Sequence, residues 1–364
     1  MEINFIDVKK QYNKMKSEID SAVLSVMSKG QFIMGQDVFD LEYNLSNYTE
    51  SEYSISCSSG TDALLLALMS LNIRPGDEII TTPFTFISTV EVILLLKAKP
   101  VFVDIRKDTF NIDEELIERA ITKKTKAIIP VSLFGQTSDM ESVNSIAKKY
   151  SLKVIEDAAQ SFGGSIRDKK VGVFGDVAAT SFYPAKPLGC YGDGGAIFTN
   201  DDDLAEECKA IRIHGTKKDK YNSEMIGLNG RLDSIQAAVL LEKLSIFDEE
   251  LEMRNEVNFH YRKFLNNAQY HPEDYQSAHA LFSIVLGSDI KRDKLINRLS
   301  QNKIPLVIYY KFPIHLMKAF KYLGYQSGSL TISENLSNSI ISLPMHPYLS
   351  KSDLDLIIET IQKK

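Results

Sequence analysis

Short apolar runs alternate with helical stretches through the middle of this 364-residue chain. The apolar runs are rich in β-branched residues, as buried strands are, and the stretches between them repeat apolar residues at helical spacing. We predict strands at 78–82, 100–104, 126–133 and 153–156, and helices at 88–96, 113–120 and 140–149. This alternation predicts an α/β fold in which a mostly parallel central sheet is flanked by helices on both faces.

A further strand and turn precede this region. We predict helices at 11–27 and 38–48, a strand at 53–57 and a helix at 63–71. The turn between that strand and the next helix reads Ser58-Ser59-Gly60-Thr61-Asp62. Small residues ahead of a helix leave free backbone amides that can bind an anion, although the same pattern is also a common helix cap.

Four residues fall just after predicted strands: Thr61, Phe86, Asp157 and Lys186. Ligands of mostly parallel sheets bind at the carboxyl ends of the strands. These four residues could therefore meet in one site.

The last third of the chain has a different pattern. We predict helical structure over 203–254, interrupted at 215–230 and closed by one long helix at 232–252. Beyond it we predict strands at 280–286 and 304–309 and helices at 293–301 and 353–362. We therefore divide the chain near residue 250, into a large domain (1–250) and a smaller α+β domain (251–364).

Charge and cysteine content exclude some functions. The net charge is −6 and no basic cluster marks a nucleic-acid surface. The three cysteines are too few and too scattered for a disulfide framework or a zinc site, so we expect no metal. No apolar run approaches a membrane span and the N-terminus does not look like a secretory signal, so we expect a cytoplasmic protein.

Lys186 lies in an unusual segment. It stands between Pro184 and Pro187, and glycines follow at 189, 192, 194 and 195 before an apolar run that is typical of a strand. A lysine in such a loop is usually only solvated. Beside aromatic groups and backbone dipoles its pKa can fall, and it can then act as an amine nucleophile.

Asp157 ends a predicted strand and is open to two interpretations. A buried carboxylate needs a cationic partner or hydrogen bonds. It could be the counter-charge of a protonated ring nitrogen, or it could cap the N-terminus of a following helix.

Six short motifs, in this order, carry a resemblance to a known family. They are Ser-Gly-Thr-Asp-Ala-Leu (59–64), Pro-Phe-Thr-Phe (83–86), Glu-Asp-Ala-Ala-Gln-Ser (156–161), Ser-Phe-Tyr-Pro-Ala-Lys (181–186), Gly-Asp-Gly-Gly-Ala (192–196) and Asn-Gly-Arg-Leu (229–232). The chain resembles the DegT/DnrJ-type nucleotide-sugar aminotransferases, which use pyridoxal 5'-phosphate (PLP), from about residue 3 to residue 347. The resemblance implies the fold type I aminotransferase architecture.

The resemblance also implies roles around PLP. Lys186 would be the catalytic residue and the point of covalent attachment, Asp157 would pair with the pyridinium nitrogen, and Gln160 would address the phenolic oxygen. Phe86 would stack on the ring. The phosphate would be held by Gly60, Thr61 and Ser181.

Asn229 would reach the phosphate of the neighbouring subunit's cofactor, which implies a homodimer with shared sites. A different interpretation makes Asn229 a turn residue with positive φ. The two are compatible.

The chain looks most like the branch that aminates C3 of UDP-linked 2-acetamido sugars, with L-glutamate as the usual donor and cell-surface glycan or lipopolysaccharide precursors as products. Ser132 supports this branch, because other branches commonly carry His there. The uronic-acid enzymes read like His-Tyr-Pro at 309–311, where this chain has Tyr309-Tyr310-Lys311. We therefore expect a neutral 3-keto N-acetylglucosamine nucleotide first and its uronic acid second.

Four residues are candidates for substrate binding: Arg231, Tyr309, Tyr310 and His315. An arginine fork suits a sugar or its phosphates, but Arg231 could instead form an ion pair at a helix start. His315 is equally open to a packing role.

Three other functions remain as alternatives. The first is a 4-aminotransferase of the same family, acting on a UDP- or dTDP-linked 4-keto-6-deoxy sugar. The second is PLP-dependent sugar dehydration, in relatives that carry His in place of the lysine, against which Lys186 argues. The third is a non-catalytic PLP-binding regulator, against which the absence of a basic face argues.

Overall fold

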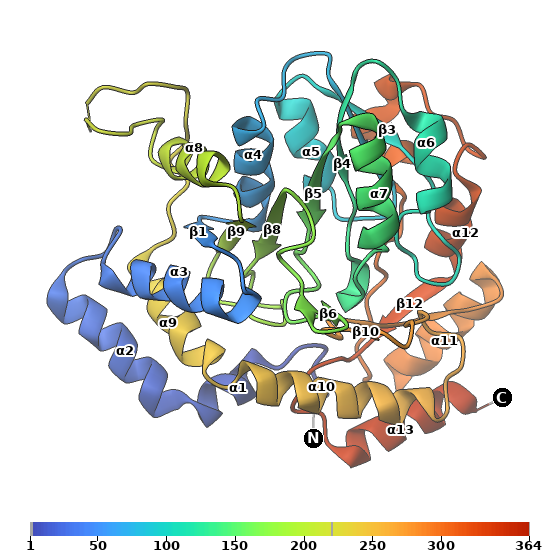
Figure 1. Ribbon diagram of the computed structural model, residues 1–364. Helices are drawn as coiled ribbons and strands as arrows, with labels where there is room; N and C mark the ends of the chain where they lie inside the picture. The colour runs from blue at the N-terminus through green and yellow to red at the C-terminus, as the bar shows by residue number, and fades with distance from the viewer. Residues whose placement is uncertain (1–2, 220, 364) are drawn as a thin grey trace.

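A seven-stranded sheet forms the centre of the molecule (Figure 1). The computed structural model describes residues 3–219 and 221–363. The strand order is β1-β9-β8-β5-β4-β2-β3. The strands are β1 (Tyr53–Cys57), β2 (Glu78–Thr81), β3 (Lys99–Phe102), β4 (Thr125–Ile129), β5 (Lys153–Asp157), β8 (Val177–Ser181) and β9 (Gly195–Thr199). Only β9 runs against the other six strands of this sheet, so the predicted mostly parallel sheet is confirmed.

Alternate residues of the strands face opposite sides of the sheet. Ile155 of β5 packs on one side with α4 (Gly60–Ser70), α5 (Ser88–Leu95) and α8 (Asp202–Arg212), whereas its neighbour Val154 packs on the other. Asp157 therefore faces the side of α4 and α5, two residues along from Ile155. The strands are buried on both faces, and the middle residues of β2, β4 and β5 are accordingly apolar.

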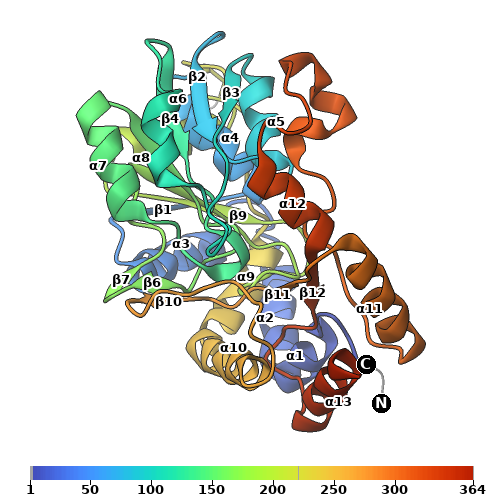
Figure 2. The same cartoon turned by 90° about the vertical axis from the view of Figure 1, so that its right-hand side faces the viewer.

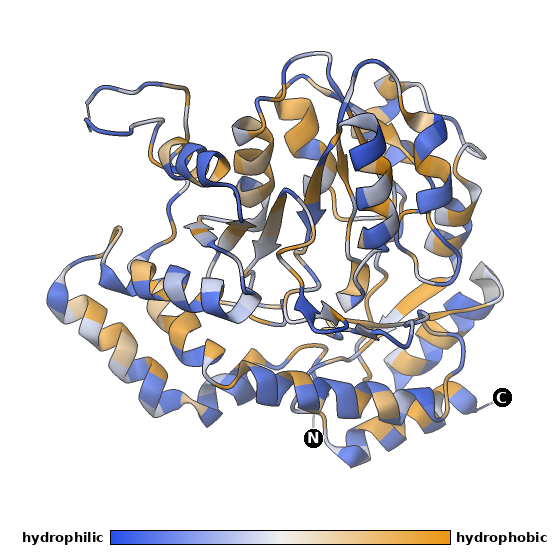
Figure 3. Cartoon of the chain, in the orientation of Figure 1, coloured by the Kyte–Doolittle hydropathy of each residue, from blue (hydrophilic) through white to orange (hydrophobic). Residues whose placement is uncertain are grey.

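The opposite side of the sheet is covered by α3 (Gln36–Thr49), α9 (Ser234–Leu244) and α7 (Met140–Tyr150) (Figure 1). In Figure 3 the helices α4 and α5 are largely orange, whereas α7 and α10 (Phe247–Arg262) show blue toward solvent. The buried helices thus read as apolar on most sides and the outer ones as amphipathic.

Two predicted helices are each divided in the structure. The helix expected at 11–27 is α1 (Val8–Lys14) and α2 (Lys16–Lys29), which meet at Met15. The single helix expected at 232–252 is wrong: α9 ends at Leu244 and α10 begins at Phe247. The helix expected at 113–120 begins as a 3₁₀ turn (Glu114–Leu116) and continues as α6 (Ile117–Ala120).

The C-terminal part contains a two-stranded antiparallel sheet of β11 (Phe282–Val285) and β12 (Ile340–Leu343), with helices packed around it (Figure 2). Its helices are α11 (Asp289–Gln301), α12 (Thr331–Ser339) and α13 (Lys351–Gln362). The strand predicted at 304–309 is wrong, because only an isolated bridge joins Val307 to Ser342. Neither α12 nor β12 was predicted from the sequence.

The proposed division near residue 250 falls inside α10, which is continuous. Ile3, from the start of the chain, packs in the same cluster as Val257 and Tyr261. The two units thus share a helix and an N-terminal strap, and the division remains a proposal.

A third, small sheet joins β10 (Tyr275–Gln276), β6 (Ser165–Ile166) and β7 (Lys169–Lys170). Across residues 3–219 and 221–363 no helix has the length and apolar character needed to cross a membrane. The same residues contain no group of three His, Cys, Asp or Glu side chains placed to hold a metal ion.

Candidate active site

A cavity of about 550 Å³ opens at the carboxyl ends of β1, β2, β5 and β8. Nine of the residues singled out in the sequence line it: Gly60, Thr61, Phe86, Asp157, Gln160, Ser181, Lys186, Tyr309 and Tyr310. The four residues that follow predicted strands do meet in one place. The last two residues of this set come from the C-terminal part and close the opposite wall.

Lys186 is held on a loop that is fastened at several points. Its backbone N–H donates to the Tyr183 carbonyl at 2.8 Å, and the Cys190 N–H donates to the Phe182 carbonyl at 2.8 Å. Gly189 has no room for a side chain, because a Cβ there would lie 2.6 Å from the Tyr183 oxygen. Buried Lys243 of α9 donates to the Gly189 carbonyl. The backbone around Lys186 is therefore fixed.

The amine of Lys186 is half-buried, and within the described residues it makes neither a hydrogen bond nor an ion pair. Burial lowers the pKa of Lys186 to about 8, and the nearby Asp157 opposes that shift. At neutral pH the amine of Lys186 is therefore deprotonated in a larger fraction of molecules than the amine of a solvated lysine. The simple solvated-loop interpretation of Lys186 does not describe this setting.

Asp157 is the last residue of β5 and only 4% exposed. Its Oδ2 accepts from the Thr89 hydroxyl at 2.8 Å and its Oδ1 accepts from the Ala159 N–H at 3.2 Å. Burial raises the pKa of the carboxyl, and these two donors and Lys186 oppose the rise. The helix-cap interpretation is wrong, because residues 158–164 form turns and no helix begins there.

Gln160 has its amide fixed at both ends. Its Oε1 accepts from the Phe134 N–H at 2.9 Å, and its Nε2 donates to the Tyr310 hydroxyl at 2.9 Å. Tyr310 in turn packs edge-on against Phe84, with ring centroids 5.8 Å apart. Tyr310, named from the sequence as a substrate residue, thus contacts Gln160 directly.

A cradle for an anion lies at the start of α4. The Ser59 hydroxyl caps the helix by accepting from the Asp62 N–H at 3.0 Å. The backbone N–H groups of Gly60 and Thr61, in the first turn, have no partner within the helix and lie at the cavity end of α4. A Cβ on Gly60 would lie 2.6 Å from the Ser181 Cβ, so only glycine lets β8 approach this closely. Helix amides and a serine hydroxyl together suit a phosphate.

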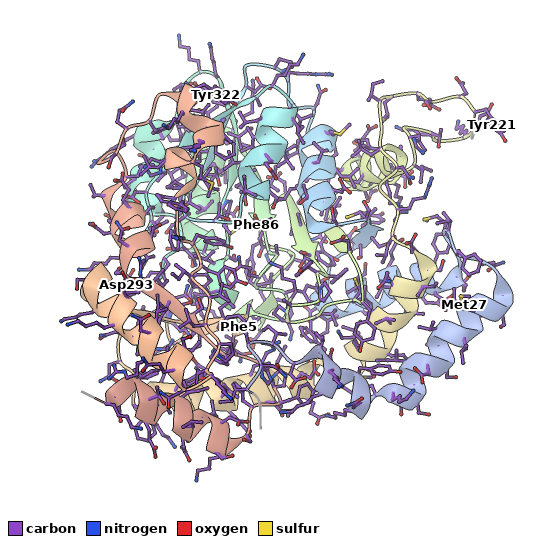
Figure 4. All side chains as sticks on the ribbon, turned by 180° about the vertical axis from the view of Figure 1, so that it is seen from behind. Phe5, Met27, Phe86, Tyr221, Asp293 and Tyr322 are labelled. Atoms are coloured by element: carbon purple, nitrogen blue, oxygen red, sulfur yellow. The ribbon has the colours of Figure 1, made fainter. Side chains whose placement is uncertain are left out.

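Phe86 is 55% exposed although it is a large aromatic residue. It lies near the middle of the view in Figure 4, above Phe5, and both line the cavity. An aromatic face left open inside a cavity suits a planar ring as its partner.

Three of the named residues lie outside this cavity. Asn229 is exposed and forms a β-bridge with Ile213; its φ is not positive, so the turn interpretation is wrong. Arg231 has a buried Nε without a hydrogen-bond partner and no ion pair in the described part of the chain, so the helix-start ion pair is not found.

His315 is buried, and its Nε2 lies 3.1 Å from the Glu334 carboxylate. Its ring packs against Phe102 and Tyr325, with centroids at 6.3 and 6.1 Å. Its position is that of a packed residue, and a substrate role for it remains a prediction.

The cavity also contains residues that the sequence reasoning did not name: Phe5, Ile6, Thr85, Thr89, Asp193, Ala280 and Leu281. Thr85 and Asp193 lie inside motifs quoted above, at 83–86 and 192–196, so a signal for them existed. Phe5 and Leu281 carry no such signal, because only the folded chain brings the N-terminal strap and the C-terminal part to the cavity.

These residues fit PLP. An unpaired amine, a buried carboxylate with free lone pairs, an open aromatic face and an anion cradle are all present in one cavity. They match a reactive carbonyl, a ring nitrogen, a planar ring and a phosphate, respectively.

Comparison with known proteins agrees with this geometry. The model of the DegT/DnrJ/EryC1/StrS aminotransferase family matches residues 13–362. The chain is 42% identical to the UDP-2-acetamido-2-deoxy-3-oxo-D-glucuronate aminotransferase of Pseudomonas aeruginosa, covering 98% of both chains. It is 34% identical to the UDP-N-acetyl-3-dehydro-alpha-D-glucosamine 3-aminotransferase of Acidithiobacillus ferrooxidans, covering 99% of this chain and 97% of that one.

A solved structure from Brucella abortus, a DegT DnrJ EryC1 StrS aminotransferase, superposes with a TM-score of 0.94 at 42% identity, covering 99% of this chain and 98% of that one. Other relatives bear the names of dTDP-amino-sugar transaminases and, in one case, of a pleiotropic regulatory protein.

Proposed function

Because the chain belongs to the DegT/DnrJ/EryC1/StrS aminotransferase family, we propose that it moves an amino group from L-glutamate to the C3 keto carbon of a UDP-linked 2-acetamido sugar. It is a PLP-dependent sugar aminotransferase that acts on nucleotide-linked keto sugars. The observation that carries the proposal is the meeting of Lys186, Asp157 and Gln160 in one cavity.

PLP, when bound, supplies a ring that takes up electrons as a bond at the amino carbon of the donor breaks. Lys186 would move a proton at that carbon, since its lowered pKa of about 8 leaves part of the amine neutral near neutral pH. Asp157 would accept a hydrogen bond from the ring nitrogen. Gln160 would hold the phenolic oxygen, and the start of α4 with Ser181 would hold the phosphate.

The charges of the cavity support a neutral sugar. Its charged lining side chains in the described part of the chain are Lys186, Asp157 and Asp193. A uronic acid would bring a further carboxylate, and this subunit offers no spare cation there to receive it. We therefore rank the 3-keto N-acetylglucosamine nucleotide first and its uronic acid second, although the uronate relative is the more similar in sequence.

A homodimer with shared sites completes the proposal. Asn229 and Arg231 lie outside the cavity of their own subunit, and along the chain they follow the projecting segment labelled at Tyr221 (Figure 4). Arg231, with its unpartnered Nε, would supply a cation to the anionic donor or to the nucleotide phosphates in the other subunit's cavity. Four exposed apolar residues, Leu24, Met27, Ile33 and Ile226, are candidates for the surface that such a dimer would cover.

The proposal places the enzyme in the cytoplasm, in synthesis of cell-surface glycan or lipopolysaccharide precursors. The three cysteines are buried and unpaired, which suits a reducing compartment. The second candidate is a 4-aminotransferase for UDP- or dTDP-linked 4-keto-6-deoxy sugars, which the dTDP-sugar relatives favour. A regulator without catalysis does not explain why the amine of Lys186 lies unpaired beside Asp157.

The test is to incubate the PLP-loaded protein with L-glutamate and one keto sugar at a time. The three sugars are the neutral 3-keto sugar, its uronic acid and a 4-keto-6-deoxy sugar. We expect 2-oxoglutarate and a new amine at C3, located by NMR, with the neutral sugar as the best substrate. Amination only at C4 would replace the proposal with the second candidate. No amination of any of the sugars, by a protein that binds PLP, would overturn both.

A further inference from the structure

The hydroxyl groups of Thr85 and Thr89 form a chain that ends on the carboxylate of Asp157. The two hydroxyl oxygens lie 3.1 Å apart, and the Thr89 hydroxyl lies 2.8 Å from Asp157 Oδ2. Both threonines are buried and both line the cavity. The mechanism given above leaves them without a role.

The direction of this chain follows from its protons. An ionised carboxylate can only accept, so the single hydroxyl proton of Thr89 goes to Asp157. Thr89 then has only lone pairs to offer Thr85, and the Thr85 hydroxyl must donate to it. Both hydroxyl dipoles therefore point toward the carboxylate, and each strengthens the other.

Few other groups act on this carboxylate. The Ala159 N–H donates to Oδ1 at 3.2 Å and the Lys186 amine attracts the charge, while burial opposes it. Thr89 also lies in the first turn of α5, where the helix dipole favours an anion. Each carboxylate oxygen keeps a further lone pair for a ring N–H.

We propose that Thr89, supported by Thr85, is the positioning residue that holds the Asp157 carboxylate as an anion in one orientation toward the ring nitrogen of PLP. This inference rests on the proposed function, in which Asp157 pairs with that nitrogen. Thr89 acts through Asp157 and takes no proton from the substrate.

The test compares two ligands, PLP and 1-deaza-PLP, in which a C–H replaces the ring nitrogen. Thr89→Val keeps the shape of the side chain and removes the hydroxyl. We expect it to weaken PLP binding about tenfold, the loss of one hydrogen bond to a charged group, and to change 1-deaza-PLP binding by less than about twofold. Thr89→Ser keeps the hydroxyl, and its PLP affinity should stay within about threefold of the wild type.

An equal loss for the two ligands would mean that Thr89 only packs the site, and no loss for either would mean that Asp157 is oriented without it. Either result overturns the inference. Asp157→Asn tests the function beneath it: this variant should lose affinity for PLP and not for the deaza analogue. If Asp157→Asn binds both ligands like the wild type, the pairing of Asp157 with the ring nitrogen is itself wrong.

Two further variants guard against a general effect on folding. Thr49→Val removes another buried threonine hydroxyl, bonded to the Leu45 carbonyl at 2.9 Å in α3 away from the cavity, and should leave both affinities unchanged. If Thr89→Val does not fold, Thr85→Val gives the same comparison with a smaller, about threefold, loss for PLP alone. Where both fold, the double variant should lose no more than Thr89→Val, and fully additive losses would contradict a single chain.

Discussion

The Nε2 of Gln160 donates a 2.9 Å hydrogen bond to the hydroxyl of Tyr310, a residue 150 positions further along the chain. One partner follows β5 of the central sheet and the other belongs to the C-terminal part. The bond therefore fixes the two walls of the cavity relative to each other. It also sets which way the Gln160 amide points in the cavity.

Tyr310→Phe tests this bond. The ring can still pack on Phe84, but the Gln160 amide loses its acceptor and can rotate. We expect kcat to fall about tenfold and the free energy of unfolding to fall by about 1 kcal/mol, with PLP still bound. Steady-state kinetics and urea unfolding measure both. An unchanged kcat would show that Gln160 is oriented by Phe134 alone.

Lys186→Ala tests the amine. We expect turnover to fall by about a thousandfold or more, and the visible absorbance of the attached cofactor to disappear, because no other lysine in the described part of the chain lines the cavity. Lys209→Ala, at a partly exposed lysine of α8 that pairs with Glu206, is the control and should behave like the wild type. An active, yellow Lys186→Ala protein would end the assignment.

Gly60→Ala tests the close approach of α4 and β8. The added Cβ would meet the Ser181 Cβ at 2.6 Å, so we expect a loss of about 1–3 kcal/mol in unfolding free energy and weaker PLP binding. Gly287→Ala meets nothing closer than 3.6 Å and should be neutral. Adding Ser181→Gly to Gly60→Ala should restore stability, but not the proposed contact of the Ser181 hydroxyl with the phosphate.

His346 predicts a loss of stability in acid. Its Nδ1 accepts from the Tyr348 N–H at 3.2 Å and its Nε2 donates to the Asn4 carbonyl at 3.2 Å, so the buried ring is held neutral. Burial lowers the pKa of His346 from 6.5 to about 4. The unfolded chain then binds the extra proton first as pH falls below 6.5, and the native state loses about 1.4 kcal/mol per pH unit until pH 4.

Urea unfolding at pH 7.5 and 5 measures this contribution as a difference between proteins. His346→Asn should be less stable at pH 7.5 and should lose less stability than the wild type on acidification. Equal slopes for His346→Asn and the wild type would rule out this role of His346.

We expect Tyr309 and Lys311 to influence the preference for the neutral sugar over the uronic acid. Tyr309 lines the cavity and stands where the uronic-acid enzymes read like His, with Lys311 where they read like Pro. Tyr309→His combined with Lys311→Pro should raise the kcat/KM for the uronic acid relative to the neutral sugar by about tenfold, since an imidazole can pair with the carboxylate. A ratio that does not move would place the discrimination elsewhere.

Strands β1 to β5 were predictable because each has a short apolar run, and the first four are each followed by a helix, whereas β8 was not predicted. The break between α9 and α10 was not predictable, because its two residues, Ser245 and Ile246, are neither glycine nor proline. Helix α12 was missed for a different reason. Its sequence is rich in Ser and Asn, which are weak helix formers, and its first amides are capped from far away: Asp104 accepts from the N–H groups of Ile332 and Ser333.

Some residues of the site could be predicted from the sequence and others could not. Residues at strand ends, such as Asp157 and Lys186, could be placed together because the carboxyl ends of parallel strands share one edge. Thr89 and Phe5 could not be placed, because their contacts with Asp157 and Tyr309 depend on how a helix turns toward the sheet and where the N-terminal strap crosses.

The reversed direction of β9 bears on the order in which the molecule can assemble. Since β8 and β9 are antiparallel neighbours, Ser181 pairs with Gly195 across residues 182–194 alone, and the Lys186 loop is the bend of a local hairpin. Closing this segment costs less chain entropy than closing residues 130–152 or 158–176, which join β5 to its parallel neighbours, by up to about 0.5 kcal/mol. The lysine's setting can thus form early in folding, and the partners that give it chemistry arrive afterwards.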